Sequence, residues 1–197
     1  MTKSLKYCQM ILKPQDLRAI RPIAENINDT ARVEPYIREA ETLRLVDLLG
    51  ATLYKWIEET DFTAAGPFVF TKDNGERVEL TSKEADTLLN GGYYTDGCGN
   101  GRMTDGLKTG IAYLAYSRFV MNNPINPTAF GVRYKNGEFS TEVEDSVLAR
   151  TAAEARKVGE AYLAKAMEYV KALGLLPSCA VPSRNPASSI RVGRKRL

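Results

Sequence analysis

The longest predicted helix is a run of thirty residues, 144–173, near the C-terminal end of the chain. At 1.5 Å per residue, a helix of this length extends roughly 45 Å. Gly174 follows at the position where a left-handed helix cap is expected. The many alanines of this predicted helix allow another helix to approach closely: Ala149, Ala152, Ala153, Ala155, Ala161, Ala164 and Ala166. Its larger apolar residues are Val147, Leu148, Val158, Tyr162, Leu163, Val170 and Leu173. We therefore expect a mainly α chain whose other helices pack along this one.

Shorter segments with helical spacing of apolar residues precede it. The predicted helices are 14–20, 31–49, 51–59, 82–89 and 104–122. Gly50 ends the second, and Thr81 with Glu84 forms a capping box before the fourth. Thr104 is the predicted cap of the fifth. In the segment 31–49 the charged residues, Glu41 among them, occupy the side opposite the apolar stripe. The pattern predicts an antiparallel helical bundle.

Two segments have the pattern of β-hairpins. β-favouring runs flank Asn74-Gly75 within 68–80, and similar runs flank Asn136-Gly137 within 132–140. The intervening segment 90–101 contains five glycines and is predicted to be a loop. Its large aromatic residues Tyr93 and Tyr94 suit contact with a partner protein. We therefore expect one or two hairpins to project from the helices, with Asn74, Tyr93, Tyr94 and Asn136 as candidate contact residues.

Charge divides the chain into a body, 1–173, and a basic C-terminal arm, 174–197. The whole chain has 27 basic and 24 acidic residues, a net charge of +3. The arm contains five of the bases and no acid, so the remainder has 22 − 24 = −2. Rich in proline and serine, the arm is expected to be extended and to lack fixed structure when alone.

The C-terminal arm has three possible roles. The arm could remain a solvated extension, fold onto a partner as a docking segment, or contact DNA phosphates weakly. Docking would combine basic residues with the apolar anchors Ile190, Val192 and Leu197. The candidate docking residues are Arg184, Ile190, Arg191, Arg194, Lys195 and Arg196.

The composition argues against an enzyme. There is no histidine, which excludes Ser-His-Asp and Cys-His catalysis and imidazole metal sites. The glycines at 97–101 fail the dinucleotide motif because Arg102 replaces its third glycine. A calcium loop starting at Asp96 fails because Cys98 and Leu107 occupy ligand positions. No carboxylate pair is singled out, so we predict no catalytic residue, no metal and no cofactor.

The three cysteines, Cys8, Cys98 and Cys179, are far apart and form neither a C-x-x-C pair nor a disulfide framework. Their spacing indicates synthesis in a reducing cytoplasm. Neither a secretory signal nor a run of about 20 apolar residues is present, so no membrane partner is expected.

Within residues 14–173, several short motifs resemble one family of phage proteins. They are Arg21-Pro22-Ile23, Asn26-Ile27, Pro35-Tyr36-Ile37-Arg38-Glu39-Ala40, Leu49-Gly50, Leu53-Tyr54, Leu89-Asn90-Gly91-Gly92-x-Tyr94, Gly106-Leu107-Lys108, Ala112-Tyr113-x-Ala115-Tyr116-x-Arg118 and Phe130-Gly131-Val132. This string is similar to the head–tail connector (adaptor) proteins of tailed bacteriophages infecting Bacteroidales, including the crAss-like phages. The hairpin at 68–80 and the C-terminal arm have no clear counterpart in that pattern.

The resemblance implies a structural virion protein made in the bacterial host cytoplasm. Such subunits form a homo-oligomeric ring, expected here to be a dodecamer, beneath the portal protein at the head–tail junction. The ring joins the capsid to a downstream tail protein or second ring, and genomic DNA passes through its channel without sequence-specific contact. A different class of function remains open, a DNA-binding accessory protein that acts through the C-terminal arm.

Overall fold

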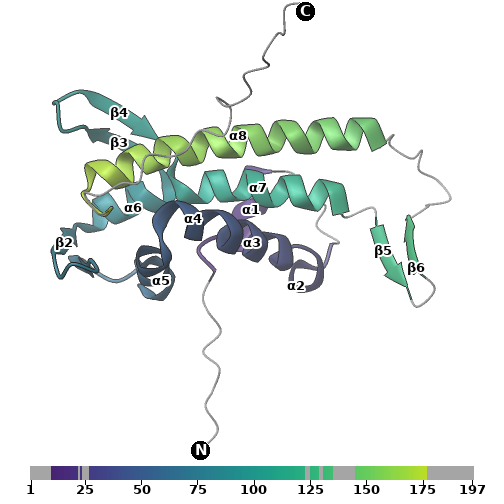
Figure 1. The fold of residues 1–197 in the computed structure, drawn as a ribbon, viewed down its shortest axis with the longest axis horizontal. Helices are drawn as coiled ribbons and strands as arrows, with labels where there is room; N and C mark the ends of the chain where they lie inside the picture. The colour runs from purple at the N-terminus through teal and green to yellow at the C-terminus, as the bar shows by residue number, and fades with distance from the viewer. Residues whose placement is uncertain are drawn as a thin grey trace, which may run out of the picture.

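The computed structural model describes residues 10–21, 23, 27–122, 125–128, 131–134 and 145–176, and these residues are mostly helical (Figure 1). The helices are α1 (Pro14–Ile20), α2 (Asp29–Arg32), α3 (Glu34–Ala40), η1 (Glu41–Leu45), α4 (Val46–Leu49), α5 (Ala51–Glu59), α6 (Ser82–Asn90), α7 (Gly106–Asn122) and α8 (Asp145–Ala172). The strands are β1 (Phe68–Thr71), β2 (Arg77–Leu80), β3 (Gly92–Thr95), β4 (Gly101–Thr104), β5 (Ile125–Thr128) and β6 (Gly131–Tyr134), joined as three antiparallel pairs.

The longest helices, α7 and α8, lie side by side and run in opposite directions (Figure 1). Their closest approach is made by two glycines, which the alanine pattern did not predict. A Cβ added at Gly110 would lie 2.6 Å from Leu163 Cγ, and one added at Gly159 would lie 3.0 Å from the Gly110 carbonyl oxygen. Further along, the Ser117 hydroxyl donates to the Ala152 carbonyl over 2.7 Å.

The predicted role of the alanines of α8 is therefore only partly confirmed. Ala152, Ala155 and Ala166 are buried. The other four are exposed: Ala149, Ala153, Ala161 and Ala164. The cap predicted at Gly174 is confirmed, because this residue has φ +69° and the following N–H, of Leu175, bonds to the Val170 carbonyl.

The helix predicted at 31–49 is not continuous. Val33 separates α2 from α3, and a π-helical turn, η1, precedes α4. Such a turn changes which side chains face inward. Glu41, predicted on the solvent side, is only 2% exposed, and its Oε1 accepts a hydrogen bond from the Leu12 N–H at 2.9 Å. The expectation for Glu41 was wrong.

The hairpin predicted at 68–80 is confirmed, with Phe68 opposite Leu80 and Thr71 opposite Arg77. Its inward face joins a group of aromatic rings centred on Trp56 of α5. The Trp56 ring lies 5.2 Å from that of Phe70, and its Nε1 donates to the Val69 carbonyl. The capping box of Thr81 and Glu84 is also confirmed at the start of α6.

The segment 90–101 is not simply a loop, contrary to the prediction. β3 pairs with β4, and only 96–100 forms the turn between them. Asp96 makes this turn compact, because its Oδ1 accepts hydrogen bonds from the N–H groups of Cys98 and Asn100. Thr104, the predicted cap of the following helix, is the last residue of β4, and α7 begins two residues later at Gly106.

The second predicted hairpin, 132–140, lies only in part within the described residues. Its first residues belong to β6, which pairs with the preceding strand β5, Ile125 opposite Tyr134. Only two residues separate β5 from β6, a spacing that favours a tight hairpin. Residues 135–144, including Asn136, lie outside the described part of the chain.

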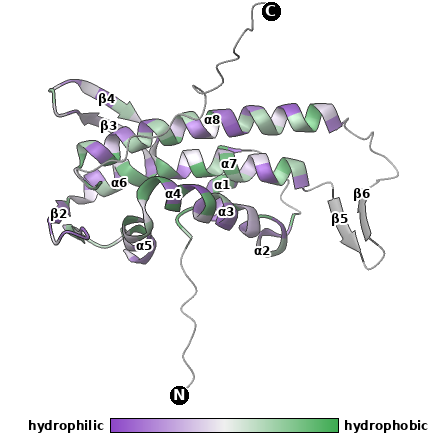
Figure 2. Cartoon of the chain, in the orientation of Figure 1, coloured by the Kyte–Doolittle hydropathy of each residue, from purple (hydrophilic) through white to green (hydrophobic). Residues whose placement is uncertain are grey.

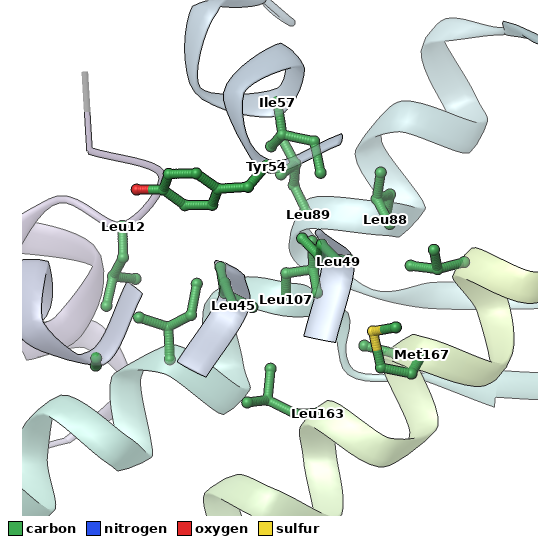
Figure 3. Close-up of a cluster of buried hydrophobic side chains, with 14 of the residues drawn as sticks. Leu12, Leu45, Leu49, Tyr54, Ile57, Leu88, Leu89, Leu107, Leu163 and Met167 are labelled. Atoms are coloured by element: carbon green, nitrogen blue, oxygen red, sulfur yellow. The ribbon is translucent and has the colours of Figure 1, made fainter. Parts of the chain in front are cut away.

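The core lies between these helices, where side chains from α4, α5, α6, α7 and α8 meet (Figure 3). Leu49, Leu88, Leu107 and Leu163 are among its buried members. Figure 2 shows hydrophilic residues interspersed with hydrophobic ones along α8, as expected for a helix with one face on the core and one in solvent.

Candidate functional site

The β3–β4 hairpin presents two exposed large apolar side chains, one of which, that of Tyr93, is the most exposed among the described residues. Tyr93 is 80% exposed and Met103 50% exposed. They are directly opposite each other on β3 and β4, so they share one face of the hairpin. The hairpin projects from the end of the α7–α8 pair where α8 ends (Figure 1). Tyr93 and Met103 together form an exposed apolar face, which we call the hairpin face.

Tyr94, the neighbouring candidate residue, faces the opposite way. Its ring centroid lies 4.5 Å from that of Tyr169 on α8. Burial raises the pKa of Tyr169 to about 12, and its hydroxyl donates to the Glu84 carbonyl at 3.4 Å. Tyr94, which is half-buried, therefore packs the hairpin against the body, and Tyr93 is the more exposed of the two tyrosines.

Two ion pairs stiffen the tip of this hairpin. Arg102 Nε donates to Asp96 Oδ2 at 2.7 Å, and Arg102 Nη1 lies 3.5 Å from Glu168 of α8. The bond from Arg102, helped by the turn N–H groups, lowers the pKa of Asp96 to about 2. A preformed hairpin loses less conformational entropy when it binds a partner.

The base of the hairpin depends on two glycines with positive φ, Gly91 at +94° and Gly106 at +75°. A Cβ at Gly106 would lie 2.5 Å from Gly91 N and 2.5 Å from the Leu89 carbonyl oxygen. The two backbones thus touch where the chain leaves α6 and enters α7, and this contact sets where the hairpin projects.

A second exposed region, the α7 groove, was not predicted, and its lining is mixed, with more polar than apolar residues. It is a groove of about 520 Å³ lined by residues of η1, α4, α7 and α8. Leu43 is 57% exposed and Met121 45% exposed along it. Arg44 bonds to Glu160 across it, with Nε 2.9 Å from Oε2. One feature of the sequence could have indicated this groove: Leu43 lies off the apolar stripe of the predicted helix 31–49.

Of the other candidate residues, only Asn74 is described. It lies exposed in the turn between β1 and β2, and its Oδ1 accepts from the Glu76 N–H at 3.0 Å. It also lines a small pocket of about 220 Å³ beside Leu175. The candidate residues of the C-terminal arm lie outside the described residues: Arg184, Ile190, Arg191, Arg194, Lys195 and Arg196.

Within the described ranges, no group of three or more histidine, cysteine, aspartate or glutamate side chains is arranged to hold a metal ion. Among the same residues, no helix has the length and hydrophobicity needed to span a membrane. The described residues present two exposed surfaces, the hairpin face and the α7 groove.

Residues 47–174 match a family of unknown function (DUF6712). The match begins within α4 and ends at the glycine cap of α8. No curated protein and no solved structure matches the chain. Because the match covers more than half of its length, the chain belongs to the DUF6712 family.

Proposed function

We propose that this chain is a head–tail connector (adaptor) subunit of a tailed bacteriophage. In this role it forms a ring under the portal protein, joins the capsid to the tail and lines the passage for DNA. The observation that carries the proposal is the run of connector-like motifs within residues 14–173. The DUF6712 match covers most of that stretch but carries no functional information of its own.

The arrangement of exposed surfaces supports a ring. A ring closed by head-to-tail contacts needs two different complementary faces on each subunit. The hairpin face projects beside the start of α7, whereas the α7 groove includes Met121 near the end of the same helix. Each face of a stable contact buries roughly 800 Å². The finer architecture that we propose is an antiparallel helical bundle built on α7 and α8, with the hairpins as its extensions.

The partners follow from this role. They are other copies of the chain in a dodecameric ring, the portal protein, and a downstream tail protein or second ring. Genomic DNA passes through the channel without sequence-specific contact. The place of action is the head–tail junction of the virion, after synthesis in the host cytoplasm.

Deleting Pro177–Leu197 is expected to abolish binding to the portal protein encoded in the same genome. The reason is that the C-terminal arm supplies basic and apolar docking groups, while all of the described core lies in residues 10–176. Co-purification with the portal protein measures binding, and thermal unfolding checks that the body is folded. Unchanged co-assembly after the deletion would exclude the docking role.

Replacing Tyr93 and Met103 together by serine is expected to prevent ring closure on the portal while leaving the fold intact. Both side chains are exposed, so the free energy of unfolding should change by only about 0.5 kcal/mol. Val147→Ser, on an exposed apolar residue of α8, is the matched control. Electron microscopy of the portal complex reads out the ring; normal rings from the double variant would contradict the assignment of this face.

A DNA-binding accessory protein is the second candidate, favoured by the five bases and absence of acids in the C-terminal arm. Phosphate contacts by this arm would make DNA affinity fall steeply with salt concentration. A salt titration of DNA binding therefore separates the candidates. The connector proposal expects no measurable binding of the isolated chain to DNA, even at low salt.

A further inference from the structure

The negative charge of the described residues is concentrated in one part of the chain. Residues 51–90, which form α5, β1, β2 and α6, contain four bases and eight acids, a net charge of 4 − 8 = −4. The acids are Glu58, Glu59, Asp61, Asp73, Glu76, Glu79, Glu84 and Asp86. The described residues before this segment have six bases and six acids, and 91–122 and 145–176 each have a net charge of +1. We call residues 51–90 the acidic end.

Most of these acids have no cation of their own in the described structure. The salt bridges within the acidic end are Lys72–Glu76, at 2.9 Å, and Lys55–Glu59, at 3.9 Å. Asp73 instead accepts a hydrogen bond from the Thr52 hydroxyl at 2.8 Å, and it remains exposed. The acidic end therefore presents excess negative charge to solvent, which attracts a basic partner.

An apolar pocket opens beside this charge. It has a volume of about 220 Å³ and is lined by buried side chains of Leu49, Leu53 and Phe70 together with exposed Asp73 and Asn74. An apolar pocket bordered by a carboxylate suits an aliphatic side chain that has a basic neighbour in sequence.

The described chain ends at this same pocket. Leu175 is one of its lining residues and is almost fully buried. The 21 residues that follow, 177–197, contain five bases and no acid, with Ile190 and Val192 on either side of Arg191 and Leu197 next to Arg196. An extended segment of this length reaches up to roughly 70 Å, so every part of the acidic end lies within its range.

We propose that residues 177–197 dock onto the acidic end of their own chain. One aliphatic anchor of the arm fills the pocket beside Leu175, and the neighbouring basic side chains pair with Asp73 and the acids of β1–β2. The contact is intramolecular because the segment is tethered at the pocket, which gives it an effective concentration in the millimolar range. Docking then keeps the arm in place until another partner displaces it.

Zero-length carbodiimide cross-linking of the isolated full chain tests this contact, because Lys195 is the only lysine in 177–197. The reagent joins an amine to a carboxylate that it touches, and mass spectrometry identifies the pair. We expect Lys195 to be linked to acids of the acidic end, with Asp73 among them, and the yield to fall severalfold in 1 M salt, where the Debye length is about 3 Å. In a mixture of ¹⁵N-labelled and unlabelled chains, both residues of each linked pair should carry the same label.

Charge reversal supplies the matched comparison. Asp73→Lys with Glu79→Lys should lower the yield of Lys195 cross-links to the remaining acids of the acidic end by about three- to tenfold. Asp145→Lys with Glu154→Lys, which reverses two exposed acids of α8, should leave it unchanged. Tryptic cleavage after Arg191 and Arg194 should accelerate by a similar factor only in the first variant.

Three results would overturn the proposal: mixed-label pairs, equal cross-linking to acids outside 51–90, or equal cleavage rates in the two variants. None of these measurements involves a portal protein or a virion. The inference therefore fails or succeeds separately from the proposed connector function.

Discussion

Gly106→Ala is expected to be the most destabilising single substitution at the hairpin base. Gly106 has φ +75°, a conformation that costs an L-residue about 1–2 kcal/mol. The added Cβ would also lie 2.5 Å from two backbone atoms, Gly91 N and the Leu89 carbonyl oxygen, which no side-chain rotation can relieve. We expect a loss of about 3–4 kcal/mol, a large share of the 5–15 kcal/mol typical of native domains. The midpoint of urea unfolding measures it.

Gly97→Ala is the matched control for this substitution. Gly97 lies in the turn of the same hairpin, its φ is not positive, and no atom lies within 4 Å of the position of an added Cβ. It should change the free energy of unfolding by at most about 0.5 kcal/mol. Equal unfolding midpoints for the two variants would show that the backbone contact at Gly106 does not support the fold.

Glu41→Gln is expected to remove a pH dependence of stability. Burial raises the pKa of Glu41 from 4.5 to about 7, and the hydrogen bond from the Leu12 N–H offsets this only in part. Between these values the folded state binds more protons than the unfolded state. The contribution of Glu41 to stability is therefore complete below pH 4.5, falls as the pH rises to about 7, and stays low above it. The fall amounts to roughly 3 kcal/mol.

The measurement is the free energy of unfolding at pH 4.5 to 8 for the native chain and the variant. The difference between the two profiles isolates Glu41 from the other carboxylates, since Gln cannot ionise. Glu154→Gln, at an exposed position of α8, controls for the loss of a charge and should leave the slope unchanged. A slope that persists in Glu41→Gln would show that another group titrates in this range.

Glu41 also illustrates why part of the fold could not be predicted from the sequence. On a regular helix it falls among charged residues, and only the π-helical turn together with the packing of Leu12 places it in the core. The Leu12 N–H is 29 residues away in the chain. A period of 3.6 residues contains no information about such a partner.

The candidate contact residues show the same division. Tyr93 and Tyr94 were both predicted to contact a partner, and the structure exposes them unequally: Tyr93 is exposed, whereas Tyr94 is half-buried against Tyr169 of α8. Strand alternation would have separated the two had the segment been predicted as β3 rather than a loop. The α7 groove joins residues of four elements, so the pattern within any one element could not predict it.

The features that could be predicted from local patterning are those whose physical causes lie within a few residues. These are the capping box before α6, the glycine ends of α4 and α8, and the β1–β2 turn at Asn74-Gly75. The approach of Gly110 to Gly159, the burial of Glu41 and the projection of β3–β4 depend instead on long-range packing. The reason is that local capping and turn energies act between neighbours in the chain, whereas close packing and desolvation depend on atoms that meet only after the helices have assembled.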